Sequence, residues 1–316
     1  MKFTWPGYPQ SQSEFERLMS ALDNALSAEG LQPFQRPLHV GRKLWEALAW
    51  GGNALPPESL SDAPGFVGDV LMAKAQHWYV ETYGNRLKLD WAYGYAPARL
   101  GNTIWRVRSG VTYGRVTLFI DRNLENRGVE LGTQGAEASL NVLNDVENLS
   151  QGLVDRLPEE ALREHLAFHF FMHQALQWRE QLPQTDLFRM ARGDYDQSTA
   201  DVVAHRYGQA RWGAEQSVEK TLKGFLQVAG MPFPSGGPNG HNLRHIGGLL
   251  AAGTGIDVSS VLLELAACSP KVRYGDEPST ESQALHANHA VLGVLDQLRV
   301  SSKAAALLDL HNKPRS

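Results

Sequence analysis

The sequence predicts an α+β protein, with N-terminal helices and a small antiparallel sheet followed by an all-α antiparallel bundle. Between residues 86 and 120, apolar and polar residues alternate, as in strands with one buried face. Between residues 214 and 229, apolar residues recur at steps of three or four, as on the buried face of a helix. Pro183, Gln184 and Thr185 separate these two patterns. We therefore expect two domains, residues 1–184 and 185–316, which also suits a chain of 316 residues.

The N-terminal domain is expected to begin with helices and then to change to strands. Helices are predicted over residues 11–28, 42–50 and 66–83. Strands are predicted over residues 86–95, 103–108 and 113–120, with turns at residues 101–102 and 109–110. Two helices then follow, over residues 136–156 and 157–181. The second opens with Pro158 and two glutamates, which are typical of a helix start.

The C-terminal domain is expected to be entirely helical. Helices are predicted over residues 186–207, 209–229, 242–252, 258–268 and 281–298. The second of these carries a core stripe formed by Ala214, Val218, Leu222, Phe225 and Ala229. Thr280 and Gln283 have the spacing of a capping box, which marks the start of the last helix.

Composition and charge are those of an ordinary soluble globular protein. Hydrophobic residues make up 42% and charged residues 20%, with a formal net charge of −4. Neither predicted domain has a basic excess, which disfavours a dedicated duplex-DNA binder. The single cysteine, Cys268, excludes an internal disulfide and a cysteine zinc cluster. With no apolar run of membrane-spanning length and no apolar segment in the first residues, we expect a cytoplasmic protein without a signal peptide.

Four short motifs follow one another through the predicted bundle. They lie in its first helix, its second helix, the loop before its third helix and the loop before its last helix. Their residues are Arg189, Ala191 and Asp194; Ala214, Gln216, Glu219, Lys220, Leu222 and Lys223; Gly240, His241, Asn242 and Leu243; and Arg273, Tyr274 and Gly275.

In order and placement, these motifs resemble those of HEPN domains. The Arg273-Tyr274-Gly275 segment is similar to the Arg-Tyr-Pro of one branch of the family, with glycine in place of proline. In the first motif, Ala191 is one position earlier than in the usual pattern. The resemblance implies an antiparallel helical bundle that forms a homodimer. It also implies a nucleotide- or RNA-related role in a prokaryotic stress, defence or toxin-antitoxin system.

The resemblance leaves the activity open, because many HEPN domains are metal-independent ribonucleases that use Arg-x(4–6)-His. No pair within residues 186–316 has this spacing. Arg163 and His169 have it, but they lie in the preceding helix and about 120° apart around its axis, so they are weak catalytic candidates. We favour a binding role for a nucleotide, RNA or a protein partner. A divergent ribonuclease and a purely structural interaction protein are the alternatives.

A cationic set in the bundle is the predicted ligand site. His241, Arg244 and His245 surround the start of the third helix, where anions bind readily. His241 could instead cap that helix, and Lys223 could pair with Glu219 one turn away. The complete predicted site is Lys220, Lys223, His241, Arg244, His245, Arg273 and Tyr274.

Three histidines, His165, His169 and His173, lie along one stripe of a single predicted helix. Two imidazoles one turn apart can share a metal ion, but no carboxylate ligand is identifiable by spacing. A packed polar stripe is therefore the favoured interpretation, and a metal or phosphate role the alternative. His286 and His289, three residues apart in the last helix, are interpreted as ordinary surface or core residues.

The predicted sheet carries a basic face formed by Arg86, Lys88, Arg106 and Arg108, with aromatic residues between them. Such a face can bind single-stranded nucleic acid by charge and stacking. It can equally be the solvated face of a half-buried sheet, which we favour. The sequence has no phosphate-binding loop, dinucleotide fingerprint or nucleophile elbow. We therefore expect no cofactor, apart from a metal at the histidine stripe, and no membrane partner.

Overall fold

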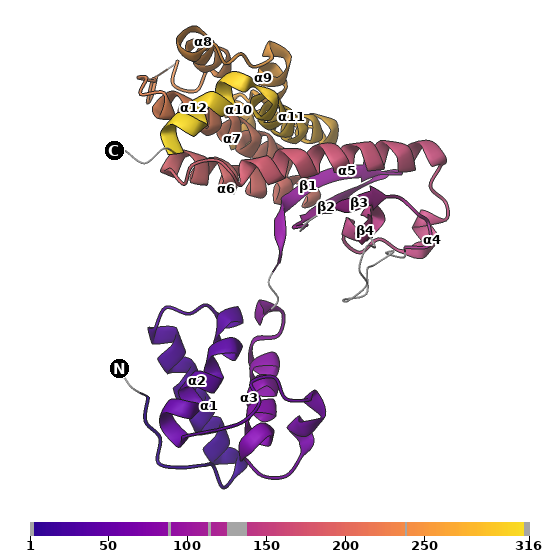
Figure 1. Cartoon of the computed structure of the whole chain (residues 1–316). Coiled ribbons are helices and arrows are strands. Elements are labelled where there is room, and N and C mark those ends of the chain that lie inside the picture. The colour runs from indigo at the N-terminus through magenta and orange to yellow at the C-terminus, as the bar shows by residue number, and fades with distance from the viewer. Residues whose placement is uncertain (1–2, 88–89, 113–114, 125–137, 238, 313–316) are drawn as a thin grey trace. The chain divides into compact units, whose positions relative to one another are not determined.

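The computed structural model describes residues 3–87, 90–112, 115–124, 138–237 and 239–312. The chain forms two compact units, Met1–Asp90 and Trp91–Ser316. The architecture is mostly helical, with small sheets in the N-terminal half of the chain, which confirms the predicted fold class (Figure 1).

The first unit is a helical assembly built from α1 (Gln12–Ala28), α2 (Arg36–Leu48) and α3 (Gly68–Tyr83), with short 3-10 turns at Pro33–Gln35, Glu58–Asp62 and Gly84–Leu87. Its core is the apolar stripe of α1 packed on α2 and α3, and includes Phe15, Leu22, Leu44, Met72 and Tyr79. The helix α2 begins six residues before its predicted start, because Pro37 opens the helix instead of breaking the chain.

A buried ion pair also holds the first unit together. Arg36 donates from Nη1 to both carboxylate oxygens of Asp23, at 3.0 and 2.9 Å. The hydroxyl of Tyr83 donates to Asp23 Oδ2 at 2.5 Å. Arg36 also donates to the hydroxyl of Ser27 and to the carbonyl of Leu31. Both oxygens of the buried carboxylate therefore have hydrogen-bond donors.

The second unit begins with two small sheets. β1 (Ala92–Leu100) and β2 (Thr103–Gly110) form an antiparallel hairpin. β3 (Val116–Phe119) pairs in parallel with β4 (Ala138–Asn141). The prediction of one antiparallel sheet with three or more strands is therefore wrong. The first predicted strand was also placed too early, because Arg86 lies in a 3-10 turn of the first unit.

The helix predicted over residues 136–156 is replaced by β4, a 3-10 turn (Val142–Asp145) and the short α4 (Gln151–Val154). Asparagine side chains explain the difference, since they compete with helical backbone hydrogen bonds. Asn141 exchanges two hydrogen bonds with the backbone of Asp121, and Asn148 adopts a left-handed conformation with φ 59°.

A long helix, α5 (Glu159–Arg179), packs along the β1–β2 hairpin and against the helical bundle (Figure 1). The bundle contains α6 (Asp186–Val203), α7 (Tyr207–Val228), α8 (Leu243–Thr254), α9 (Ser260–Ala266), α10 (Pro270–Tyr274), α11 (Glu281–Val300) and α12 (Ser302–Asn312). One continuous core connects the hairpin, α5 and the bundle. The domain boundary predicted after residue 184 lies inside this second unit, between α5 and α6.

Several local predictions for the bundle are confirmed. Four of the five stripe residues on α7 are fully buried, and the fifth, Ala229, is the C-terminal cap of the helix. The capping box of Thr280 and Gln283 starts α11. His289 lies 2.7 Å from the carbonyl oxygen of Pro97 through Nε2, which ties α11 to β1. His286 is exposed on the same helix.

Candidate functional site

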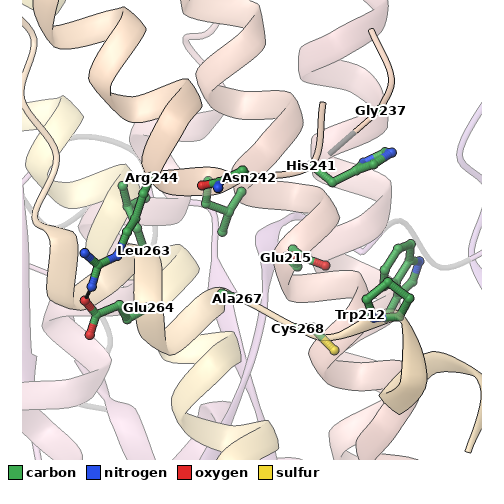
Figure 2. A pocket seen from close by; sticks show the side chains of 12 residues that line it. Trp212, Glu215, Gly237, His241, Asn242, Arg244, Leu263, Glu264, Ala267 and Cys268 are labelled. Carbon is green, nitrogen blue, oxygen red and sulfur yellow. Dashed lines mark ion pairs between the residues drawn. The ribbon is translucent and has the colours of Figure 1, made fainter. Parts of the chain in front are cut away.

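A cavity of about 500 Å³ lies in the bundle between α7, the start of α8, α9 and the segment that leads to α10. Leucine and alanine side chains form much of its wall. Its polar and aromatic lining consists of Trp212, Glu215, His241, Asn242, Arg244, Glu264 and Cys268. Figure 2 shows Trp212, Glu215 and His241 on one side of this cavity, with Arg244 and Glu264 on the other.

Two buried carboxylates, Glu215 and Glu219, lie one turn apart on α7, and Glu215 lines the cavity. Glu219 lies 2.7 Å from the ammonium of Lys223 and 2.8 Å from Nδ1 of His241. Lys223 is itself buried, and it also donates to the carbonyl of Gly240 at 2.7 Å. Glu219 thus connects α7 to the loop before α8, and both of its oxygens have partners.

Glu215 differs from Glu219 in having an unsatisfied oxygen. Its side chain is 5% exposed, and its Oε2 is buried without a hydrogen-bond partner in the described part of the chain. Burial raises the pKa of Glu215 to about 7, and the nearby charge of Glu219 adds to the rise, while a hydrogen bond from the Cys268 backbone opposes it. Near neutral pH this carboxyl group is therefore present in both its neutral and its charged form.

Two predicted ligand residues, His241 and Arg244, line the cavity. The side chain of His241 is 56% exposed while its Nδ1 is held by Glu219. Arg244 forms an ion pair with Glu264 across the start of α8, and both side chains are more than half exposed. The N-terminal cap of α8 is Asn242, which accepts a hydrogen bond from the backbone of His245. The prediction that His241 might cap this helix is therefore wrong.

The other predicted ligand residues lie around this cavity or away from it. Arg273 is exposed, with its guanidinium 4.7 Å from the ring centre of Trp212. His245 is exposed near the start of α8. Lys220 forms an ion pair with Asp194 on α6, so it faces the neighbouring helix. The side chain of Tyr274 lies outside the described residues.

The Gly275 position explains one departure from the expected motif. Gly275 ends α10 in a left-handed conformation with φ 81°. Proline is restricted to φ near −65°, so an Arg-Tyr-Pro sequence could not adopt this turn. Glycine adopts it without a steric penalty.

The histidine stripe is a buried ladder within the second unit. The ring centres of His165 and His169 are 6.3 Å apart, and those of His169 and His173 are 6.2 Å apart. His169 lies 2.9 Å from Asp145 through Nε2, and His173 lies 3.1 Å from the hydroxyl of Ser109 through Nδ1. Burial lowers the pKa of His165 to about 4 and also lowers that of His173. Neutral rings are therefore the main form of both at pH 7.

A metal role for this ladder has no geometric support in the structure. Across the ranges that the structure describes, no three His, Cys, Asp or Glu side chains are placed to hold one ion. The contacts of the ladder are instead those of a packed polar stripe.

The side chains of Arg163 and His169, the weak catalytic candidates, do not come together. Arg163 is exposed on α5, whereas His169 is buried beside Asp145. The two side chains thus lie in different environments of the same helix, as their angular separation predicted.

The predicted basic face is divided between the two units. Arg86 stacks near Tyr83 in the first unit, and Lys88 lies outside the described residues. In β2, Arg106 pairs with Glu147 at 2.9 Å, and Arg108 lies 3.7 Å from Asp145. The charges of the two β2 arginines are therefore balanced by acidic partners.

Comparison with known families identifies the helical part of the second unit. Residues 184–300, from the loop before α6 to the end of α11, match the HEPN domain. These residues form a HEPN domain. Comparisons with curated proteins and with solved structures give no match. Among the described residues, no helix is both long enough and apolar enough to cross a membrane.

Sequence reasoning did not single out Trp212 and Glu215, which line the cavity. It named Glu219, which is buried one turn after Glu215, only as a motif residue and as a possible partner of Lys223. Glu215 follows the core residue Ala214 directly, and Glu219 follows Val218. Two acids four residues apart at the border of an apolar stripe are a signal of buried charge. That signal was available in the sequence, but the cavity needs α8 and α9, which only the fold brings to α7.

Proposed function

We propose that the HEPN domain binds a nucleotide, either free or within single-stranded RNA, in the cavity beside Glu215. The observation that carries this proposal is the buried carboxyl of Glu215, which has an unpartnered oxygen and a pKa of about 7. A buried polar atom without a partner costs about 1–3 kcal/mol. A ligand that supplies the missing hydrogen bond recovers part of that free energy.

A nucleobase suits this group because its edge carries donors and acceptors side by side. A neutral carboxyl can donate from one oxygen and accept at the other. Trp212, in the same wall, offers an aromatic surface, and stacking on an aromatic side chain contributes about 1–3 kcal/mol per base. The volume of about 500 Å³ falls within the range of about 300–1,000 Å³ usual for small-molecule sites.

Cationic groups beside the cavity support a phosphate-bearing ligand. Arg244 lies at the rim in an exposed pair with Glu264, and exposed pairs are weak enough to exchange for a phosphate. Arg273, which lies over the ring of Trp212, and the exposed His241 lie on the opposite side of the cavity (Figure 2). We assign the base to the Glu215 side and the phosphate to the Arg244 side.

The test is a calorimetric titration of the full chain with the four ribonucleoside monophosphates and a short single-stranded RNA, from pH 6 to pH 8.5. We expect wild-type affinity to fall as the pH rises through about 7, because the carboxyl loses its donor proton. Glu215→Gln keeps a donor and an acceptor, so it should bind with little pH dependence. Glu215→Ala should lose at least tenfold in affinity.

The matched control is Glu164→Gln, which neutralises an exposed glutamate on α5. It should bind as the wild type does. The proposal is wrong if no nucleotide or RNA binds, or if Glu215→Ala binds as tightly as the wild type.

A ribonuclease is the second candidate, and one observation favours it. Glu215, with a pKa of about 7, and His241, held by Glu219, line the same cavity. A carboxylate and an imidazole could take and return a proton during phosphodiester cleavage. RNA cleavage in EDTA that is lost in both Glu215→Gln and His241→Gln would establish it, and intact RNA after prolonged incubation would reject it.

We further propose, from the HEPN resemblance, a homodimer that works in a stress or defence setting in the cytoplasm. A purely structural interaction protein remains the competing proposal. In that case no nucleotide or RNA would raise the melting temperature of the chain. Sedimentation equilibrium would measure the oligomeric state directly.

A further inference from the structure

A second cavity, of about 600 Å³, lies between β3 and α5, outside the HEPN domain. Val116 and Leu118 from β3 and Leu166 and Phe170 from α5 form its apolar wall. Phe170 is 52% exposed, whereas the adjacent His169 is buried. An exposed phenylalanine in a concave apolar wall is typical of a ligand site rather than of a solvated helix face.

Polar groups in this second cavity come from the last turns of α5. Nδ1 of His173 lies within hydrogen-bond distance of the hydroxyl of Ser109. Burial lowers the pKa of His173, which favours a neutral ring. Gln174 accepts from Arg299 at 2.9 Å, and Gln177 donates to the hydroxyl of Tyr93 at 3.3 Å. These three side chains are held in place by partners in the fold, as preorganised polar groups of a binding site are.

Arg163 supplies the only positive charge among the residues that line this cavity in the described part of the chain. It is exposed, and it makes no hydrogen bond or ion pair with any described residue. Glu159, one turn earlier on the helix, is engaged by Arg122 at 2.6 Å, and the charge of Arg163 acts on it only at longer range. The planar guanidinium can donate two parallel hydrogen bonds to a carboxylate, so Arg163 in the wall of this apolar cavity can bind an incoming carboxylate.

We propose that this second cavity binds a small amphipathic carboxylate. Its apolar chain would pack against Leu118, Leu166 and Phe170, and its carboxylate would bind the guanidinium of Arg163. A single cation suits a monoanion, whereas nucleic acid and phosphate esters need several positive charges. The cavity volume lies within the usual range of small-ligand sites. The proposal is independent of nucleotide binding in the HEPN domain.

The test is isothermal titration calorimetry of the full chain with sodium decanoate. We expect one saturable site in the wild type and at least a tenfold loss of affinity in Arg163→Gln. Decanol, which has the same chain without the charge, should bind more weakly than decanoate to the wild type and equally to both proteins. Ala167→Trp, at an exposed position in the cavity wall, should block both ligands by filling the space.

The matched control is Arg189→Gln, which removes an exposed arginine on α6 that does not line the cavity. It should bind decanoate as the wild type does. The proposal is overturned if decanoate does not saturate, if Arg163→Gln and Ala167→Trp bind it unchanged, or if a single-stranded RNA displaces it.

Discussion

The two units bury ionised side chains in different ways. In the first unit, Asp23 receives donors on both oxygens from Arg36 and Tyr83. In the HEPN domain, Glu219 is equally well paired, but Glu215 one turn earlier has a buried oxygen without a partner. A fully paired buried carboxylate therefore occurs in both units, whereas the incompletely paired carboxyl of Glu215 belongs to the HEPN domain.

This difference separates a structural role from a functional one. A buried charge with all its partners holds elements in a fixed arrangement, and its loss is costly because the partner is left uncompensated. A buried carboxyl that lacks a partner and has a strongly shifted pKa is a candidate for contact with a ligand. On this basis the Asp23 cluster stabilises the first unit, and Glu215 is the residue on which the proposed nucleotide site depends.

The largest expected effect is on the first unit. Asp23→Asn keeps the size of the side chain but leaves Arg36 buried without its counter-charge. We expect a loss of about 3–5 kcal/mol in the free energy of unfolding of that unit. Urea unfolding followed by hydrogen exchange of residues 3–87 would measure it. Asp62→Asn, which makes the same change at an exposed position of the first unit, is the control, and equal stability of the two variants would contradict the comparison.

The second effect is a pH dependence that belongs to Glu215. Its pKa is about 7 in the folded chain, against 4.5 as the ordinary value. The folded state thus holds the proton more tightly, and the stability that this gives is complete below about pH 4.5 and falls until about pH 7. The difference of 2.5 pH units corresponds to about 3 kcal/mol.

Urea unfolding would give the free energy of unfolding of the wild type and of Glu215→Gln. The wild-type value minus the variant value should fall between pH 4.5 and pH 7 and stay constant above pH 7. A constant difference would show that Glu215 does not titrate abnormally.

Glu29 in the first unit should show the opposite dependence of stability on pH, because hydrogen bonds from Lys43 and Arg42 lower its pKa to about 2. Its contribution is present above pH 4.5 and is lost as the pH falls towards 2.

The third expected effect is a gain in stability, whereas the first is a loss. Glu215→Gln makes the same acid-to-amide change as Asp23→Asn, but it removes a buried charge that has no counter-ion of its own. At pH 8 we expect it to stabilise the second unit by about 1–2 kcal/mol, since function often keeps such a residue at a cost in stability. Thermal unfolding at pH 8 would detect the increase. A destabilised variant would instead show that Glu215 has a structural role, as Asp23 does.

Local features of this fold could be predicted from the sequence because they depend on neighbours along the chain. The stripe on α7, the capping box of α11 and the alignment of His165, His169 and His173 each follow from helical periodicity. Features that depend on distant partners could not be predicted. β3 pairs with a strand more than 20 residues later, which local alternation does not encode.

The site was predicted only in part for the same reason. His241 and Arg244 were found because they cluster at the start of one helix. Glu215 was missed because its burial depends on α9 and on the backbone at Cys268, which are far along the chain. Conversely, Lys220 has the right charge, but it turns to Asp194 on α6, and periodicity does not indicate which neighbouring helix it meets.

The smallest expected effect on stability tests the cationic side of the HEPN cavity. Arg244→Gln breaks the pair with Glu264, in which both side chains are more than half exposed. Solvent screens such pairs, so the free energy of unfolding should change by less than about 0.5 kcal/mol. If Arg244 receives the phosphate, nucleotide affinity should nevertheless fall about tenfold, and the loss should diminish at high salt. Equal affinity in both proteins would show that Arg244 does not receive the phosphate. Recognition would then depend on the buried carboxyl of Glu215, which has no counterpart among the fully paired carboxylates such as Asp23.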